Sequence, residues 1–370
     1  MSWAIWITGI PGSGKSAIAR AAAADLAAGG ERVEVLELDA LRRALTPVPS
    51  YDAAERERVY RALVAIAAAL TRAGMPVLID ATAHRHAWRD LARASIADFA
   101  EVQLECPLDV ARTRERTRAA GHHPTAIYAQ AGRPGATVPG MDVPYESALS
   151  PELCIDTAGE PVHAAAARVA ALARSLARRR VTLRLADGFT VWVSGRPGSG
   201  KTTVVAGVCE RLEARGVPMV VLEAAQFLAT VATQRVPARL DRDMATRAIV
   251  EAARRLSEAG FAVIVDGAAP FPDTARLARE LLDTFAQVEL VCPADVCRTR
   301  ERAVRWNLVP CPGLGRPMAA PDLGLDYESV LAPDLIVFTD VLNEATAAEE
   351  VLALVERLER AARERRRPCA

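Results

Sequence analysis

The chain has 370 residues, of which 51% are hydrophobic and 25% are charged, a composition typical of globular proteins. Lys plus Arg and Asp plus Glu both number 46, so the net charge is zero and gives no indication of a nucleic-acid or membrane-surface partner. The N-terminus lacks the basic start of a signal peptide, and no apolar run reaches the roughly 18 residues of a membrane span. Seven cysteines without C-x-x-C spacing indicate reduced thiols. We therefore expect a cytoplasmic protein with no nucleic-acid or membrane partner.

The first predicted elements surround a glycine-rich motif. An apolar strand over residues 3–7 precedes the sequence GIPGSGKS at residues 9–16, and an alanine-rich helical pattern follows over residues 17–28. The spacing G-x-x-x-x-G-K-[ST] in this context predicts a phosphate-binding loop, because glycines let backbone N–H groups turn toward phosphate oxygens at the positive end of a helix. Lys15 would reach the β- and γ-phosphates of ATP, and Ser16 would ligate Mg²⁺. The predicted nucleotide-binding residues are Gly9, Gly12, Ser13, Gly14, Lys15 and Ser16.

Strands and helices alternate along the next 150 residues. The apolar patterns predict strands over residues 32–38, 76–80, 100–106 and 153–156, and helices over residues 53–73, 88–100, 108–119 and 162–178. Residues 121–139 have glycine, proline and no periodicity, so we expect a lid loop there. Such alternation predicts a parallel sheet with helices on both faces and ligands beyond the carboxyl ends of the strands. Asp39 and Asp80 would then lie on the same rim as the phosphate loop.

The whole pattern occurs a second time, 186 residues later. The motif GRPGSGKT at residues 195–202 follows the apolar residues 190–193, and Asp80 corresponds to Asp266. We therefore predict two tandem α/β domains of the P-loop NTPase (kinase) type, over residues 1–179 and 180–370. Thr202 would be the Mg²⁺ ligand of the second loop. Its predicted nucleotide-binding residues are Gly195, Gly198, Ser199, Gly200, Lys201 and Thr202.

The rim of the first repeat has side chains suited to phosphoryl transfer from ATP, which needs a group that deprotonates or orients the acceptor and cations that offset the developing charge. Asp39 is the predicted base, with the capping of a helix that starts at Ala40 as its alternative role. Asp80 could hold Mg²⁺ through water or organise the acceptor pocket. Several arginines on the segments after these strands could bind an anionic acceptor, namely Arg42, Arg56, Arg89 and Arg93.

These motifs make the first repeat similar to the adenylylsulfate (APS) kinase family. The similarity rests on WITG followed by the loop motif, on ELDALR at residues 37–42, and on GMDVPYE at residues 140–146 with PEL at residues 151–153. The resemblance implies ATP- and Mg²⁺-dependent phosphorylation of the ribose 3′-hydroxyl of APS. It also implies that Tyr51 stands where the family stacks a phenylalanine on the substrate adenine, and that Arg114 lies on the nucleotide side of the lid. The family's acceptor-side positions correspond here to Asp39, Arg42, Tyr51, Arg56, Arg89 and Arg93.

Several positions depart from the family pattern. Glu37 and Leu38 replace an Asp-Gly pair, Val59 replaces an asparagine, and residues 81–84 (ATAH) replace Ile-Ser-Pro. The lid sequence ATVPG at residues 136–140 lacks the lysine and phenylalanine of the family's K-G-F-T-G. The sequence therefore leaves open a kinase of another small molecule, of the gluconate or nucleoside type, and a nucleotide-binding regulator without turnover.

The second repeat lacks the acceptor-side groups. Ala225 stands at the position of Asp39, Leu228 at that of Arg42 and Pro237 at that of Tyr51, while Arg242 and Arg279 remain. We therefore predict that this repeat binds nucleotide, turns over poorly and serves as a regulatory or structural partner. We also expect the two repeats to pack on each other, and the sequence leaves a homo-oligomer open.

Overall fold

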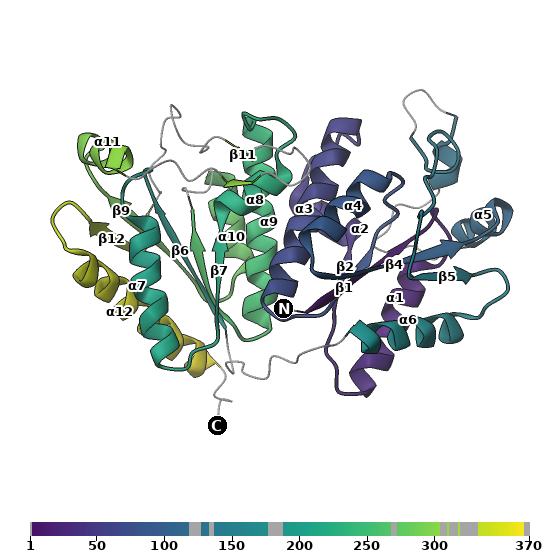
Figure 1. The fold of residues 1–370 in the computed structure, drawn as a ribbon, viewed down its shortest axis with the longest axis horizontal. Helices are drawn as coiled ribbons and strands as arrows, with labels where there is room; N and C mark the ends of the chain where they lie inside the picture. The colour runs from purple at the N-terminus through teal and green to yellow at the C-terminus, as the bar shows by residue number, and fades with distance from the viewer. Residues whose placement is uncertain are drawn as a thin grey trace. The chain divides into compact units, whose positions relative to one another are not determined.

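The computed structural model describes residues 2–117, 127–132, 137–176, 188–267, 272–303, 309–310, 317–318 and 332–365. The chain divides into two compact units, unit 1 (Met1–Val181) and unit 2 (Thr182–Ala370). Each unit is an α/β domain built on one five-stranded parallel sheet (Figure 1). Most of the predicted lid loop 121–139 lies outside the described residues.

The sheet of unit 1 has the order β2-β3-β1-β4-β5. Strand β1 lies at the centre of this sheet. All its residues are buried, as expected for a mostly apolar strand covered on both faces. It pairs in parallel with β3 through Ala4 and Val77 and with β4 through Ala4 and Phe99. The strands are β1 (Trp3–Thr8), β2 (Glu34–Glu37), β3 (Val77–Asp80), β4 (Asp98–Glu105) and β5 (Leu153–Asp156).

Helices cover both faces of this sheet. Trp3, Ile5 and Ile7 point to one face and pack against α1 and α6 in a single hydrophobic core. Trp6 points to the other face, where its ring lies 6.3 Å from Tyr60 of α3. The helices are α1 (Lys15–Ala28), α2 (Leu38–Leu45), α3 (Ala53–Arg72), α4 (His86–Ser95), α5 (Leu108–Arg116), the 3-10 helix η1 (Ile127–Gln130) and α6 (Val162–Leu176).

Unit 2 repeats this architecture with the sheet order β7-β8-β6-β9-β12. Its registers match those of unit 1 at an offset of 186 residues, since Thr190 pairs with Val263 and with Phe285. The strands are β6 (Phe189–Gly195), β7 (Met219–Glu223), β8 (Ala262–Asp266), β9 (Phe285–Val291) and β12 (Leu335–Phe338), with the separate hairpin β10 (Val309–Pro310) and β11 (Pro317–Met318). The helices are α7 (Lys201–Ala214), α8 (Ala224–Val231), α9 (Arg239–Glu258), α10 (Pro272–Leu281), α11 (Ala294–Ala303) and α12 (Glu344–Arg365).

Several predicted element boundaries differ from the structure, and two of these differences affect the site. The predicted helix over residues 88–100 ends at Ser95, because Phe99 and Ala100 pair with β1 and belong to β4. The predicted strand over residues 32–38 ends at Glu37, and Asp39 is the second residue of α2 rather than the residue before a helix. Asp39 therefore does not cap a helix that starts at Ala40. Within the described residues, no helix is both long and apolar enough to span a membrane.

Candidate functional site

The phosphate loop of unit 1 connects β1 to α1. The Lys15 ammonium group donates hydrogen bonds to the carbonyl oxygens of Gly9 (3.0 Å) and Ile10 (2.9 Å), so it lies over the mouth of the loop. The Ser13 N–H donates to the Ile10 carbonyl at 3.1 Å and closes the turn. Gly14 ends the loop in the left-handed conformation (φ 98°), and α1 begins at the next residue. The first-turn N–H groups of α1 therefore face the loop, as an anion site requires.

Gly12 shows why the loop needs glycine. A Cβ atom there would lie 2.3 Å from the Ala111 carbonyl oxygen of α5, and the residue has φ 76°. The loop thus passes directly against α5 with no room for a side chain. The buried Ser13 hydroxyl lacks a hydrogen-bond partner among the described residues. A cradle of this shape with a spare hydroxyl fits the phosphates of a nucleotide.

Asp80 ends β3 beside this loop and is buried. Burial raises the pKa of its carboxyl group, while the charge of Lys15 and a hydrogen bond with the Ser16 side chain oppose the rise. The nearby carboxylates of Glu37 and Asp39 raise that pKa further. The Ser16 hydroxyl and the Asp80 carboxylate together supply the oxygen donors that Mg²⁺ prefers, so these residues fit a magnesium ion next to bound phosphates.

The acceptor side is formed by α2 and by the start of α3. Arg42 of α2 forms an ion pair with Glu55 of α3 (2.9 Å), and both side chains are largely buried. The Arg42 guanidinium also lies 5.1 Å from the ring centroid of Tyr51, which is half exposed. Tyr51 has φ 57°, an unfavourable conformation for a non-glycine residue. The Ser50 N–H donates to the Glu55 carboxylate at 2.5 Å, and this bond holds the turn that presents the exposed ring.

Arg56 lies one residue further along α3 and contacts the end of the predicted lid loop. Its guanidinium donates to the Thr137 hydroxyl at 2.6 Å, and burial lowers the pKa of Arg56. His84, in the β3–α4 connection, is buried beside it. Burial and the charge of Arg56 lower the pKa of His84 to about 4, so the imidazole is neutral at pH 7.

The described residues also contain a contact that the sequence did not predict. The Tyr128 hydroxyl of η1 donates to the Pro11 carbonyl of the phosphate loop at 2.7 Å. Pro11 is 117 residues away in sequence, so no local pattern could have identified this pair. The bond ties a described part of the predicted lid to the nucleotide site.

Three predicted site arginines bind protein groups in this structure. Arg89 is buried and pairs with Glu101 (2.6 Å), and its contact with the acceptor stays a prediction. Arg93 pairs with Glu152 (2.6 Å), and Arg114 donates to the Thr157 carbonyl at 2.6 Å. These partners hold α4 and α5 against the sheet, and helix placement is the role that we assign to Arg93 and Arg114.

Unit 2 supports this assignment because it repeats both contacts. Arg279 pairs with Asp334 (3.1 Å) at the position of the Arg93–Glu152 pair. Arg300 donates to the Thr339 carbonyl at 2.7 Å, as Arg114 does to Thr157. Unit 2 keeps these contacts although Ala225, Leu228 and Pro237 replace Asp39, Arg42 and Tyr51, so contacts present in both units are consistent with a role in the shared fold.

The phosphate loop also recurs in unit 2 with the same geometry. Lys201 donates to the carbonyl oxygens of Gly195 (2.9 Å) and Arg196 (3.0 Å), and Thr202 donates to Asp266 at 2.8 Å. The acceptor side differs, because α8 has Ala225 and the buried Leu228 in place of Asp39 and Arg42. The lid residues 324–328 lie outside the described part of the chain.

The family model described as "Adenylylsulphate kinase" matches residues 1–156 and 187–306, which covers most of both units. The chain belongs to the adenylylsulphate kinase family. A probable adenylyl-sulfate kinase of Archaeoglobus fulgidus is 37% identical over 160 residues, which cover 42% of this chain and 97% of that protein. An adenylyl-sulfate kinase of Microcystis aeruginosa is 32% identical over 167 residues, which cover 45% of this chain and 87% of that protein.

Solved structures include a similar family member. The Mycobacterium tuberculosis APS kinase in complex with AMPPNP and APS is 30% identical, with a TM-score of 0.42, and the match covers 47% of this chain and 98% of that one. Relatives of this adenylylsulphate kinase family member thus correspond to about half of the chain, the length of one unit.

The first prediction for this family member concerns Asp80. Because burial raises its pKa above the unfolded value, ionisation of Asp80 costs the folded state stability as the pH rises above the unfolded pKa, so Asp80→Asn should leave the unfolding temperature equal or higher. We expect Mg²⁺ to strengthen ATP binding less in this variant than in the wild type, as measured by calorimetry with and without Mg²⁺. Exposed Asp25→Asn is the control, and an unchanged Mg²⁺ effect in Asp80→Asn would contradict the assignment.

The second prediction concerns His84. Its pKa of about 4 lies below the unfolded value of 6.5, so the unfolded chain binds more protons between these values and stability falls as the pH is lowered through them. His84→Gln should reduce the loss of unfolding free energy between pH 6.5 and 4.5 by about 1 to 2 kcal/mol. Urea unfolding at several pH values measures this slope, and exposed His163→Gln should leave it unchanged.

Proposed function

We propose that unit 1 transfers the γ-phosphoryl group of ATP to the 3′-hydroxyl of APS and forms 3′-phosphoadenylylsulfate. Two kinds of evidence support this activity: membership of the adenylylsulphate kinase family, and relatives named adenylyl-sulfate kinase over the length of one unit. The observation that carries it is the position of Asp39 at the start of α2, two residues after Glu37, which pairs with Asp80 at the carboxyl end of the sheet. This position supports Asp39 as the base beside the donor phosphates.

Each residue then has a chemical task. Lys15 and the loop N–H groups bind the ATP phosphates, and Ser16 with Asp80 would hold Mg²⁺, which offsets the charge of the transferring group. The Asp39 carboxylate accepts the proton of the acceptor hydroxyl. The hydroxyl oxygen forms a bond to the γ-phosphorus while the bond from this phosphorus to the β–γ bridging oxygen breaks, and ADP leaves with that oxygen.

The acceptor residues favour an aromatic, anionic substrate. The exposed Tyr51 ring offers a stacking surface for a purine base, and Arg42, whose charge is balanced by Glu55, supports the ring. Arg56 is held by the neutral Thr137 hydroxyl, and an anionic group would be a stronger partner for the guanidinium. A nucleoside- or gluconate-type acceptor remains the alternative, and gluconate offers no ring to Tyr51.

We propose a non-catalytic nucleotide site in unit 2. Two observations support it. The phosphate loop has the same geometry as in unit 1, and Ala225 stands where unit 1 has the proposed base Asp39. The Lys201 and Thr202 side chains are arranged as in unit 1, so ATP and Mg²⁺ can bind. Without Asp39's equivalent, a bound nucleotide has no general base next to it and serves regulation or stability.

The third prediction tests the acceptor and the base. Wild-type protein with ATP and Mg²⁺ should phosphorylate APS at a kcat/KM at least about tenfold above those for gluconate and nucleosides, because stacking and charge each contribute about 1 kcal/mol or more. Asp39→Asn should lower kcat by about 100-fold or more, since it removes the base. A coupled assay of ADP release measures kcat/KM for each acceptor and kcat for Asp39→Asn.

Its control is Asp25→Asn, an exposed helix aspartate that pairs with Arg174. Tight ATP binding without phosphorylation of any acceptor would favour the regulator instead. A preference for gluconate would keep the kinase and refute APS as the acceptor.

The fourth prediction concerns unit 2. Titration calorimetry with a non-hydrolysable ATP analogue and Mg²⁺ should give two sites per chain, and Lys201→Ala should remove or weaken one of them by about tenfold or more. APS phosphorylation by Lys201→Ala should continue. A single site in the wild type that Lys15→Ala alone abolishes would exclude a nucleotide site in unit 2.

A further inference from the structure

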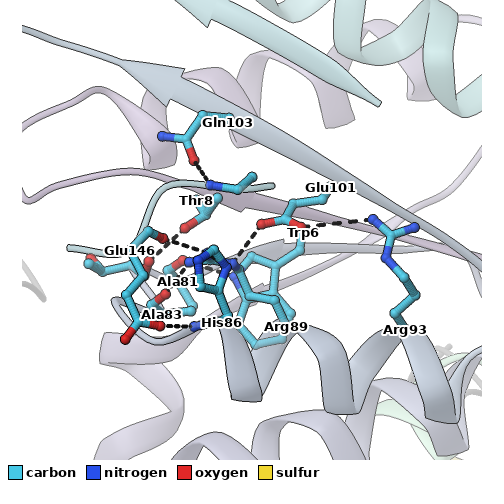
Figure 2. Close-up of polar contacts among 12 residues, drawn as sticks. Trp6, Thr8, Ala81, Ala83, His86, Arg89, Arg93, Glu101, Gln103 and Glu146 are labelled. Carbon is cyan, nitrogen blue, oxygen red and sulfur yellow. Dashed lines mark hydrogen bonds and ion pairs between the residues drawn. The ribbon is translucent and has the colours of Figure 1, made fainter. Parts of the chain in front are cut away.

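Arg89 joins to the sheet the two segments that we call the acceptor-side wall, the β3–α4 connection (residues 81–85) and Tyr145 with Glu146. The residue is 1% exposed, and its guanidinium contacts three separate segments: the Ala83 carbonyl oxygen, the Glu146 carbonyl oxygen at 2.6 Å, and the Glu101 carboxylate of β4 at 2.6 Å (Figure 2). These segments are the β3–α4 connection, the chain after the lid loop and the sheet. One buried cation therefore joins the two chain segments to the sheet.

The β3–α4 connection needs such an anchor. Ala83 has φ 41°, which costs an alanine free energy, so its surroundings must hold it in place. The Ala83 N–H donates to the Tyr60 hydroxyl at 2.8 Å, and its carbonyl accepts from Arg89. The next residue, His84, lies close enough to Arg56 for that charge to lower its pKa. The position of the acceptor-side wall thus depends on the Ala83 peptide groups.

The same network fixes the chain after the lid. The Glu146 N–H donates to the His84 carbonyl at 2.9 Å, and the Glu146 carboxylate accepts from the His86 N–H at 2.6 Å. Beside it, the Tyr145 hydroxyl bonds to Thr8 (2.9 Å) and Gln103 (3.1 Å). Thr8 is the last residue of β1, directly before the phosphate loop.

Unit 2 supplies a natural comparison, because it has lost both members of the buried pair. Gln287 occupies the position of Glu101, since each lies opposite a tryptophan of the central strand, Trp192 or Trp6. Ala275 occupies the position of Arg89 at the same offset of 186 residues along α10. The neighbouring contacts of Arg93 and of the Glu101 N–H recur as those of Arg279 and Gln287. The shared fold therefore forms with alanine and glutamine at these two positions.

We propose that Arg89, charge-balanced by Glu101, is a positioning residue that sets the acceptor-side wall of unit 1 and is dispensable for the fold itself. This inference rests on the proposed kinase function only for its kinetic consequence. The loss of the two charges together in unit 2 accompanies the loss of Asp39 and Arg42, as expected if the pair serves the acceptor site. Removing Arg89 alone leaves the buried Glu101 carboxylate with only the more distant Arg93 (3.8 Å), whereas removing both charges leaves no buried charge behind.

The test uses the double variant Arg89→Ala/Glu101→Gln, which reproduces the unit 2 pair. We expect Arg89→Ala alone to lower the unfolding temperature more than the double variant does. The double variant should raise the KM for APS by about tenfold or more while the KM for ATP stays within about twofold, because only the acceptor wall moves. Arg89→Lys should keep the charge balance and still raise the KM for APS, since an ammonium group cannot reach three partners in a fixed fork.

A second measurement is independent of catalysis. Hydrogen exchange of the Ala83 and His86 amides should be faster in the double variant by at least about tenfold, while exchange in β1 is unchanged. Arg168→Ala, which removes a surface pair with Glu160, is the control for both measurements. A double variant with wild-type exchange at these amides would overturn the positioning role, whether or not APS proves to be the acceptor. Faster exchange with no APS turnover in the wild type would refute the proposed function alone.

Discussion

The order of the parallel strands is the constraint on which the site depends. Because β1 lies between β3 and β4, and β2 lies beside β3, the phosphate loop, Asp80 and α2 all start from one edge of the sheet. The electrostatic influence of Lys15, Glu37 and Asp39 on the pKa of Asp80 follows from this arrangement. Short strands with buried, apolar residues fix the sheet, and polar groups are left for the residues at which the strands end. The donor side of the site is therefore a direct consequence of the fold.

The duplication separates the requirements of the fold from those of chemistry. The Lys–carbonyl contacts of the loop, the arginine contacts of α4 and α5, and the strand registers are found in both units. The base, the acceptor arginine Arg42 and the buried Arg89–Glu101 pair are found only in the sequence of unit 1. A residue in the first group supports the sheet and its helices. A residue in the second group distinguishes a unit that can act on an acceptor.

The sequence was sufficient for the parts of the site that lie close together along the chain. The phosphate loop, its strand and its helix follow from one motif, and family membership confirms the predicted resemblance. The partner of Arg89 could not be predicted from the sequence, because an arginine on a helix has the same sequence pattern whether it faces an anion or pairs with Glu101 on a strand. Tyr128 and Pro11, 117 residues apart, are a second case. The end of α4 at Ser95 was missed for a related reason, since pairing with β1 draws Phe99 and Ala100 into β4.

The central claim is that two nearly identical phosphate loops have different tasks because different side chains face them. Initial rates of APS phosphorylation by Lys15→Ala and Lys201→Ala, measured side by side with the wild type, test this claim most directly. The account predicts that Lys15→Ala abolishes the reaction and that Lys201→Ala retains most of it. Loss of activity in Lys201→Ala alone would place catalysis in unit 2 and contradict the account.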